Sequence, residues 1–231
     1  MKNINLLSGG AAQGLVTQLE HRFETKHRCS IDASFGAVEM MKDSLLAGTS
    51  CDVIILTQAL IEQLGQSGEV LTPSIHVLGI VKTGIAVKIG DADPAVGSPA
   101  ELKAALQSAR GIYFPDPVKA TAGIHFMAVL KQLGLDTELA ARLHPFPTGA
   151  AAMNAMAEAE GEGFLGCTQV TEILYTDGVE LVAPLPKEFE LATVYSAAAS
   201  TRAAEPEAAN QLIALLVSPD AATVRTACGF E

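Results

Sequence analysis

Apolar and polar residues alternate along the chain with two different periods. Short apolar runs such as "INLL" and "CDVIILT" are typical of strands, and the uninterrupted apolar centre of the second run indicates a parallel strand covered on both faces. Between them, Leu15, Leu19 and Phe23 recur at intervals of four and share one face of a helix. Strands that alternate with helices predict an α/β protein with a mainly parallel sheet.

The same alternation continues to the C-terminus. Ser98, Pro99 and Glu101 in "SPAEL" have the spacing of a capping box and predict the start of a helix. An alanine-rich helix at "TGAAAMNAMAEAEG" is expected to end at Gly161, and the last residues read as two closing helices. Further strands are predicted at "SIDASF", "GIYFPDP", "GFLG", "VELVAP" and "ELATVYSAAAS".

Composition and charge narrow the class of partner. The chain has 231 residues, 49% of them hydrophobic, so it can bury a large core in one big domain or two small ones. With 26 acidic against 15 basic residues the net charge is -11, which argues against a nucleic-acid partner or an anionic membrane surface. No apolar run approaches the roughly 20 residues of a bilayer-spanning helix, so direct membrane insertion is not expected.

Cysteine and histidine spacing gives no support for a metal centre. The 4 cysteines form no C-x-x-C pair and the 5 histidines show no H-x-x-x-H spacing, so we expect neither a metal nor another cofactor. Disulfides between distant cysteines stay an open alternative. The N-terminus enters a strand without the features of a secretory signal. We therefore expect a cytoplasmic protein as the sequence is written, or a periplasmic one if residues ahead of Met1 have been trimmed.

Four loops between predicted strands and helices are rich in small residues. A loop of this kind leaves the backbone N–H groups at a helix N-terminus unobstructed, and an anion can bind there. In an open α/β sheet such loops gather beyond the carboxyl ends of the strands, where ligands bind. The loops are "SGGAAQ", "SFGAVE", "KATAG" and "PTGAA".

Longer stretches resemble a known family over almost the whole chain. The segments "CDVIILTQALIEQLGQSGEV", "DPVKATAGIHFMAVLKQLG", "EFELATVYSAAAS" and "EAANQLIALLVSPDAATVRTACGF" resemble the molybdate-binding proteins of ABC transporters. The resemblance implies a type II periplasmic-binding-protein fold, with two α/β lobes, mainly parallel sheets, two hinge crossings and a ligand cleft between the lobes. By this resemblance lobe one comprises residues 1–79 and 193–231, lobe two comprises 80–192, and the hinge lies near 77–83 and 190–196.

The resemblance also implies positions for ligand binding. Two serines of the family's oxyanion site fall on Ala11 and Val38, its tyrosine falls on Gly166, and the backbone donors fall on Ala122 and Thr148. At these positions the chain keeps the backbone N–H donors of the family's site but lacks most of its side-chain hydroxyl groups. Because an unmatched buried acceptor costs about 1–3 kcal/mol, the altered pocket favours an organic di- or tricarboxylate over molybdate.

Several side chains are candidates for contact with such a ligand. Lys119 could meet a carboxylate, although a solvated loop lysine is an equal alternative. Glu39 is the candidate general base if burial raises its pKa, against the simpler role of an acid favoured by the helix dipole. His125 and Cys167 are read as structural. The predicted ligand-binding residues are Gly9, Gly10, Ala11, Phe35, Gly36, Val38, Lys119, Thr121, Ala122, Thr148, Gly149, Thr168 and Tyr195.

Three functions follow from this interpretation. The leading hypothesis is a substrate-binding protein of an ABC-type transporter, which binds a small anion and has a membrane subunit of the transporter as its partner. The alternative is an isomerase that moves a proton within a small tricarboxylate, because aconitate isomerases resemble the same family; Glu39 would then be catalytic. A nucleotide-binding dehydrogenase ranks behind both, since "GGAAQG" does not match the G-x-G-x-x-G pattern.

Overall fold

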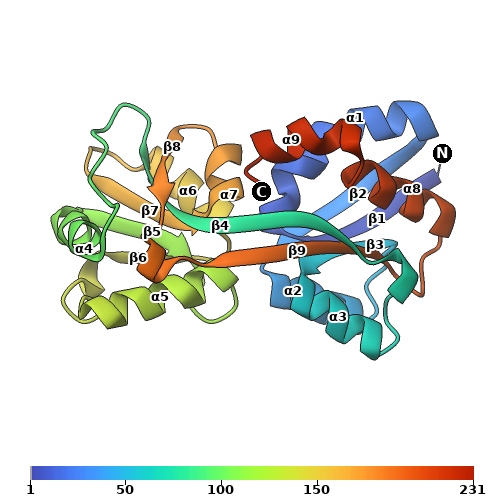
Figure 1. The fold of residues 1–231 in the computed structure, drawn as a ribbon, viewed down its shortest axis with the longest axis horizontal. Helices are drawn as coiled ribbons and strands as arrows, with labels where there is room; N and C mark the ends of the chain where they lie inside the picture. Colours follow the sequence, from blue (N-terminus) through green and yellow to red (C-terminus); the bar gives the residue numbers. More distant parts are fainter. Residues whose placement is uncertain (1) are drawn as a thin grey trace. The chain divides into compact units, whose positions relative to one another are not determined.

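The computed structural model describes residues 2–231, and this part of the chain divides into two compact units. Unit 1 comprises residues 2–81 and 193–231, and unit 2 comprises residues 82–192 (Figure 1). The chain leaves unit 1 within strand β4 (His76–Lys88) and returns to it at the start of β9 (Ala192–Ala199). Each unit has its own sheet and its own helices.

The sheet of unit 1 is built around a central apolar strand. Strand β1 (Lys2–Gly9) pairs in parallel with β2 (Cys29–Gly36) on one side and with β3 (Val53–Thr57) on the other. Strand β9 then pairs with β3 in the antiparallel direction. The carboxyl ends of β1, β2 and β3 therefore meet at one edge of this sheet, as expected for strands that lead into crossover helices.

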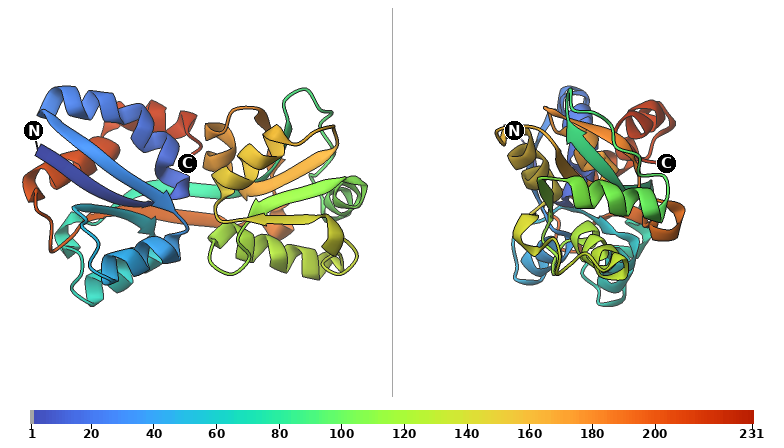
Figure 2. Two further views of the ribbon diagram at one scale, coloured as in Figure 1. Left: turned by 180° about the vertical axis from the view of Figure 1, so that it is seen from behind. Right: turned by 90° about the vertical axis from the view of Figure 1, so that its left-hand side faces the viewer.

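Helices cover both faces of the unit 1 sheet (Figures 1 and 2). Helix α1 contacts α8 and α9, while α2 and α3 contact β1 and β3. Leu15, Leu19 and Phe23 of α1 are buried in the core, as their spacing predicts. The helices are α1 (Gln13–His27), α2 (Val38–Leu46), α3 (Gln58–Gln66), α8 (Pro206–Leu216) and α9 (Ala222–Ala227), with 3-10 turns η1 (Gly10–Ala12), η2 (Thr72–Ser74) and η5 (Pro219–Ala221).

Unit 2 repeats the arrangement with a second sheet. Strand β5 (Gly111–Pro115) pairs in parallel with β6 (Leu143–Phe146) and with β7 (Phe164–Gln169). Strand β4 pairs antiparallel with both β7 and β8 (Val179–Pro184). The helices are α4 (Pro99–Ser108), α5 (Thr121–Leu133), α6 (Gly149–Glu158) and α7 (Val170–Tyr175), with 3-10 turns η3 (Ala140–Arg142) and η4 (Lys187–Phe189).

Alternate residues of the unit 2 strands face two separate apolar clusters. Ile85 and Cys167 belong to a cluster that contains Phe126 of α5. Their neighbours in sequence point the other way, and Ala86 belongs to a cluster that contains Met153 of α6. This alternation follows from the period of two in a strand and assigns α5 to one face of the sheet and α6 to the other.

The α/β class predicted from the sequence is confirmed, and so is the capping box. The Ser98 side chain accepts a hydrogen bond from the Glu101 N–H group at 3.3 Å and caps α4. The sheets are more mixed than predicted, because β4 and β9 both run antiparallel to their neighbours. Strands β4 and β6 lie in segments for which the sequence analysis predicted no element.

The end of the alanine-rich helix was predicted three residues too late. Helix α6 ends at Glu158, since Ala159 already has an extended backbone. The carbonyl oxygens of Ala159 and Gly161 instead accept hydrogen bonds from the Lys88 ammonium group. A tertiary contact from β4 thus replaces the last turn that the local sequence favours.

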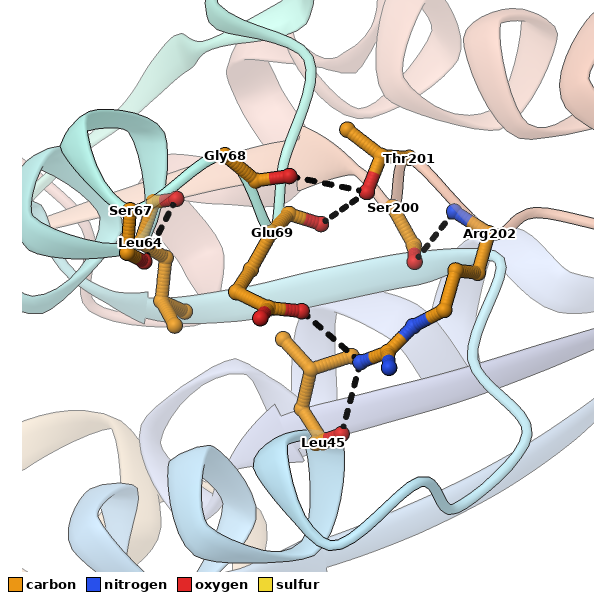
Figure 3. Close-up of polar contacts among 8 residues, drawn as sticks. All are labelled: Leu45, Leu64, Ser67, Gly68, Glu69, Ser200, Thr201 and Arg202. Carbon is orange, nitrogen blue, oxygen red and sulfur yellow. Dashed lines mark hydrogen bonds and ion pairs between the residues drawn. The ribbon is translucent and has the colours of Figure 1, made fainter.

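A buried carboxylate joins the beginning and the end of the chain within unit 1. Asp52 is 1% exposed, and its oxygens accept hydrogen bonds from the backbone N–H groups of Asn5 at 2.8 Å and Glu205 at 2.9 Å. Nearby, Arg202 donates to the Leu45 carbonyl oxygen at 3.0 Å and to the Glu69 carboxylate at 2.8 Å (Figure 3). These contacts attach the segment before α8 to β1 and to the ends of α2 and α3.

Replacing Asp52 tests this attachment. Asp52→Ala removes the buried acceptor of two partly buried backbone N–H groups, and we expect it to lower the free energy of unfolding by about 2 kcal/mol. The same change at the exposed Asp93 serves as the control and should shift stability by less than about 0.5 kcal/mol. Urea titration followed by circular dichroism measures both variants. Equal stability of Asp52→Ala and the unsubstituted protein would contradict the structural role of this carboxylate.

Candidate functional site

In unit 1, the turn η1 and the helices α2 and α3 begin at the edge where the parallel strands end, the first two of them in small-residue loops. No side chain caps η1, α2 or α3. Gly9 allows a close approach here, because a Cβ atom on it would lie 2.8 Å from Val38 Cγ1 and 3.2 Å from Tyr195 Cε1. Gly9, Val38 and Tyr195 therefore lie together, although they come from distant parts of the sequence.

The remaining candidates of unit 1 lie around the same edge. Ala11 is buried and Gly10 is half-buried in the turn after β1, while Phe35 and Gly36 form the end of β2. A Cβ atom on Gly36 would lie 2.8 Å from Met41 Cε, so a larger residue would disturb the packing of α2 on this strand. The ligand-binding role of these residues stays a prediction.

Glu39 has the geometry of a surface acid. It lies in the first turn of α2, forms an ion pair with Lys42, and its side chain is 43% exposed. Burial, which the proposed role as a base requires, is therefore missing at this carboxylate. The arrangement agrees with the simpler interpretation of an acid favoured by the helix dipole.

In unit 2, the N-terminus of α5 has no side-chain cap. Its N-cap residue is Ala120, which has no side-chain acceptor, and it is followed by Thr121 and the buried Ala122. The nearby Asp116 carboxylate accepts instead from the backbone N–H groups of Val118 and Lys119, at 2.7 and 3.0 Å. The first N–H groups of α5 are thus left without a capping side chain, and Lys119 lies exposed in the turn before them.

The N-terminus of α6, unlike that of α5, is capped by side chains of the protein. The Thr148 side chain accepts from the Ala151 N–H group at 3.1 Å. The carboxyl group of Glu172 receives hydrogen bonds from the backbone of Gly149, Ala150 and Gln169. The chain's own carboxyl group therefore occupies this helix terminus, in the place where the sequence suggested an external anion.

Gly149 and Thr168 are explained by this internal contact. A Cβ atom on residue 149 would lie 1.9 Å from Thr168 Oγ1 and 2.1 Å from Glu172 Oε2, so only glycine allows the carboxyl group to approach the helix. Thr168 donates its hydroxyl hydrogen to Glu172 at 2.5 Å. Both were predicted as ligand-binding residues; in this structure they hold Glu172.

Glu172 is the titratable group of this region that the sequence analysis missed. It is 6% exposed, and burial raises the pKa of its carboxyl group above the ordinary value, while the hydrogen bonds from Thr168 and the backbone oppose that rise. The only signal for this contact in the local sequence is Thr168, which lies four residues before Glu172. The contact with Gly149 depends on the packing of α7 against α6 and has no sequence signature.

The other reactive side chains of the sequence analysis have structural surroundings. His125 Nε2 lies 2.7 Å from the Phe189 carbonyl oxygen. Cys167 is fully buried, and burial raises the pKa of its thiol well above the ordinary value. All four cysteines are free and buried. Within residues 2–231 we find neither a cluster of three potential metal ligands nor a helix with the length and apolarity needed to cross a bilayer.

Comparisons with known proteins agree with this geometry. A family model described as bacterial extracellular solute-binding protein matches residues 4–231. An aconitate isomerase from Pseudomonas sp is 26% identical over 227 residues, which cover 95% of this chain and 84% of the relative.

Two solved structures illustrate the shared fold. The periplasmic molybdate-binding protein of Azotobacter vinelandii is 20% identical with a TM-score of 0.80, and the match covers 99% of this chain and 98% of that one. L-phospholactate-bound PEB3 is 12% identical with a TM-score of 0.70, and the match covers 99% of both chains. The periplasmic-binding-protein-like fold predicted from the resemblance is therefore confirmed.

The raised pKa of Glu172 predicts a pH dependence of stability. Between the ordinary value of 4.5 and the raised value, the folded protein holds a proton that the unfolded chain has released. The free energy of unfolding should therefore fall as the pH rises from 4.5 through the folded pKa. Glu172→Gln carries no titrating group, so its stability should fall less over the same range.

Urea titrations from about pH 4.5 to pH 8 measure this slope. Glu188→Gln changes an exposed glutamate of the same unit and provides the matched control. Identical slopes for Glu172→Gln and the unsubstituted protein would show that the Glu172 carboxyl group does not titrate abnormally.

Proposed function

Since this chain belongs to the bacterial extracellular solute-binding protein family, we propose that it captures a small organic carboxylate through the N-termini of its helices. Each unit offers such N-termini at the strand ends of its own sheet, at η1, α2 and α3 in unit 1 and at α5 in unit 2. The proposed partner is a membrane subunit of an ABC-type transporter, to which the protein would deliver its ligand.

The uncapped N-terminus of α5 is the observation that carries this proposal. Four helices begin within the described residues of unit 2, and two of them have their first N–H groups satisfied internally, α4 by Ser98 and α6 by Thr148 and Glu172. Helices α5 and α7 begin without a side-chain cap, and α5 is the longer of the two, with 13 residues against 6. Free N–H groups together with the positive end of the helix dipole favour an external anion at this terminus.

The nature of the donors supports a carboxylate rather than a mineral oxyanion. In unit 1, Ala11 and Val38 stand where the resemblance places serine hydroxyls, so this edge offers backbone N–H groups and little else. The four oxygens of a tetrahedral oxyanion need donors that converge on one small volume, whereas the carboxylate groups of a di- or tricarboxylate can each bind at a separate helix N-terminus. The relative described as an aconitate isomerase acts, by its name, on a tricarboxylate, and PEB3 was solved with an organic phosphate that carries a carboxylate.

An isomerase is the second candidate, and Glu172 is the observation that favours it. Isomerisation of an allylic tricarboxylate removes a proton from one carbon and returns a proton to another as the double bond moves. A carboxyl group whose pKa is raised above the ordinary value is a stronger base than an exposed carboxylate, and it can return the proton afterwards. Glu172 fits this role better than Glu39, because Glu172 is buried while Glu39 is paired at the surface.

A cap introduced at α5 tests the binding proposal. Ala120 has the extended backbone of an N-cap residue, so Ala120→Asp should stabilise the ligand-free protein by about 1 kcal/mol. The new carboxylate would also occupy the helix terminus, and we expect at least a tenfold loss of affinity for any carboxylate that binds. Calorimetric titration with citrate, tricarballylate, malate, succinate and trans-aconitate measures this loss.

Ser98→Ala is the matched control, because it removes a cap from α4 rather than adding one to α5. This variant should lose about 1 kcal/mol of stability and keep its affinity. Unchanged affinity in Ala120→Asp would mean that the ligand does not use the α5 terminus. Molybdate and sulfate in the same titration show whether a mineral oxyanion binds instead.

A turnover assay distinguishes the binding protein from the isomerase. If the protein converts trans-aconitate to cis-aconitate, Glu172→Gln should lower kcat by at least a hundredfold while binding persists, because glutamine cannot carry the proton. Glu39→Gln should retain most of the activity. Chromatographic separation of the two isomers after incubation measures the rate. A pure binding protein shows no conversion in any variant.

A further inference from the structure

Among the described residues of unit 2, three polar side chains, those of Thr83, Gln169 and Thr171, are buried with atoms that lack a hydrogen-bond partner, and two of them are paired across strands. Thr83 on β4 is 1% exposed and Gln169 at the end of β7 is 3% exposed. The Thr83 hydroxyl oxygen has no partner, and neither atom of the Gln169 amide has one. Most buried polar groups in proteins are hydrogen-bonded, because leaving one unpaired is unfavourable, so these side chains need an explanation.

Strand register places the two side chains together on the α5 face of the sheet. Thr83 and Gln169 are direct partners in the antiparallel pairing of β4 with β7. Two residues away on each strand, Ile85 and Cys167 belong to the apolar cluster that includes Phe126 of α5. Because side chains two residues apart in a strand share a face, Thr83 and Gln169 also lie on that face.

The same register places the pair level with the start of α5. Ala122 lies one helical turn ahead of Phe126, and both are buried on the face of α5 that packs on the sheet. Gln169 lies two residues beyond Cys167, toward the strand end after which α5 begins. The uncapped start of α5 and the unpaired Gln169 amide are therefore at the same end and on the same face of the unit 2 sheet.

The hydrogen-bonding groups of Thr83 and Gln169 limit which ligand groups can pair with them. A glutamine amide offers an acceptor oxygen as well as two N–H donors, and a threonine hydroxyl can donate and accept. The amide oxygen can pair only with a group that brings a hydrogen atom. Molybdate, sulfate and an ionised carboxylate bring none at neutral pH, whereas an alcohol hydroxyl does.

We propose that Thr83 and Gln169 recognise the hydroxyl group of a hydroxycarboxylate whose carboxylate binds at the N-terminus of α5. This inference rests on the proposed function and narrows the substrate class from organic anions to hydroxy acids. Ligand access to the two covered side chains requires movement of the residues packed over them, as in a protein that encloses its ligand.

Matched ligand pairs test the proposal on the full chain. Citrate and tricarballylate differ only by a hydroxyl group, as do malate and succinate. We expect the unsubstituted protein to bind the hydroxylated member of a pair at least tenfold more tightly, as measured by calorimetric titration. Thr83→Val and Gln169→Met keep the side-chain size and should reduce this preference to less than about threefold, with little change for the ligand that lacks the hydroxyl.

Stability of the ligand-free variants separates recognition from a structural role. Thr83→Val removes a hydroxyl without a protein partner, so its Tm should be unchanged or higher. Thr176→Val is the control, because that buried hydroxyl donates to the Glu172 carbonyl oxygen at 2.8 Å, and its loss should lower Tm.

Three results would overturn the proposal. Equal affinity for both members of each pair, or a hydroxyl preference that survives in both variants, contradicts recognition by this pair while leaving the proposed function intact. A fall in Tm for Thr83→Val as large as that for Thr176→Val would assign the hydroxyl to the internal structure. Binding of none of the four carboxylates overturns the proposed function and this inference with it.

Discussion

The N–H groups at the start of each helix need an acceptor, and the way this need is met differentiates the helices of this protein. Serine supplies the acceptor for α4, and threonine with a distant glutamate supplies it for α6. The other described helices begin without a capping side chain. Four of these, α2, α3, α5 and α7, start after the carboxyl ends of parallel strands, the position at which open α/β sheets bind ligands.

The contrast between α5 and α6 shows that similar loops can lead to an uncapped and to an internally capped helix N-terminus. Both begin after loops of small residues, "KATAG" and "PTGAA". Glycine at 149 permits the approach of a carboxyl group in α6, yet that group comes from Glu172 of the same chain.

The candidate site was predictable in the parts that depend on local backbone. Gly9, the turn before α2 and the start of α5 lie where the loops and helix periodicity predicted them. Glu39 shows the limit of that reasoning. Its position beside the loop suggested a general base, but its side chain forms an ion pair with Lys42 and is exposed to solvent. Solvent exposure depends on which residues surround the side chain in space, and the local sequence does not determine it. Glu172, Thr83 and Gln169 escaped prediction because burial and pairing across strands decide their chemistry.

The sequence by itself determined the alternation of strands and helices, the cap at Ser98 and the loops that expose helix termini. Hydrophobic period, capping residues and small side chains act over a few residues, so the local sequence is sufficient for them. Tertiary structure alone decided that β4 and β9 run antiparallel to their neighbours, that α6 ends at Glu158, and that a carboxyl group fills one helix terminus while another stays open. Those outcomes depend on which distant residues meet, and contacts between distant residues have no periodic signal in the sequence.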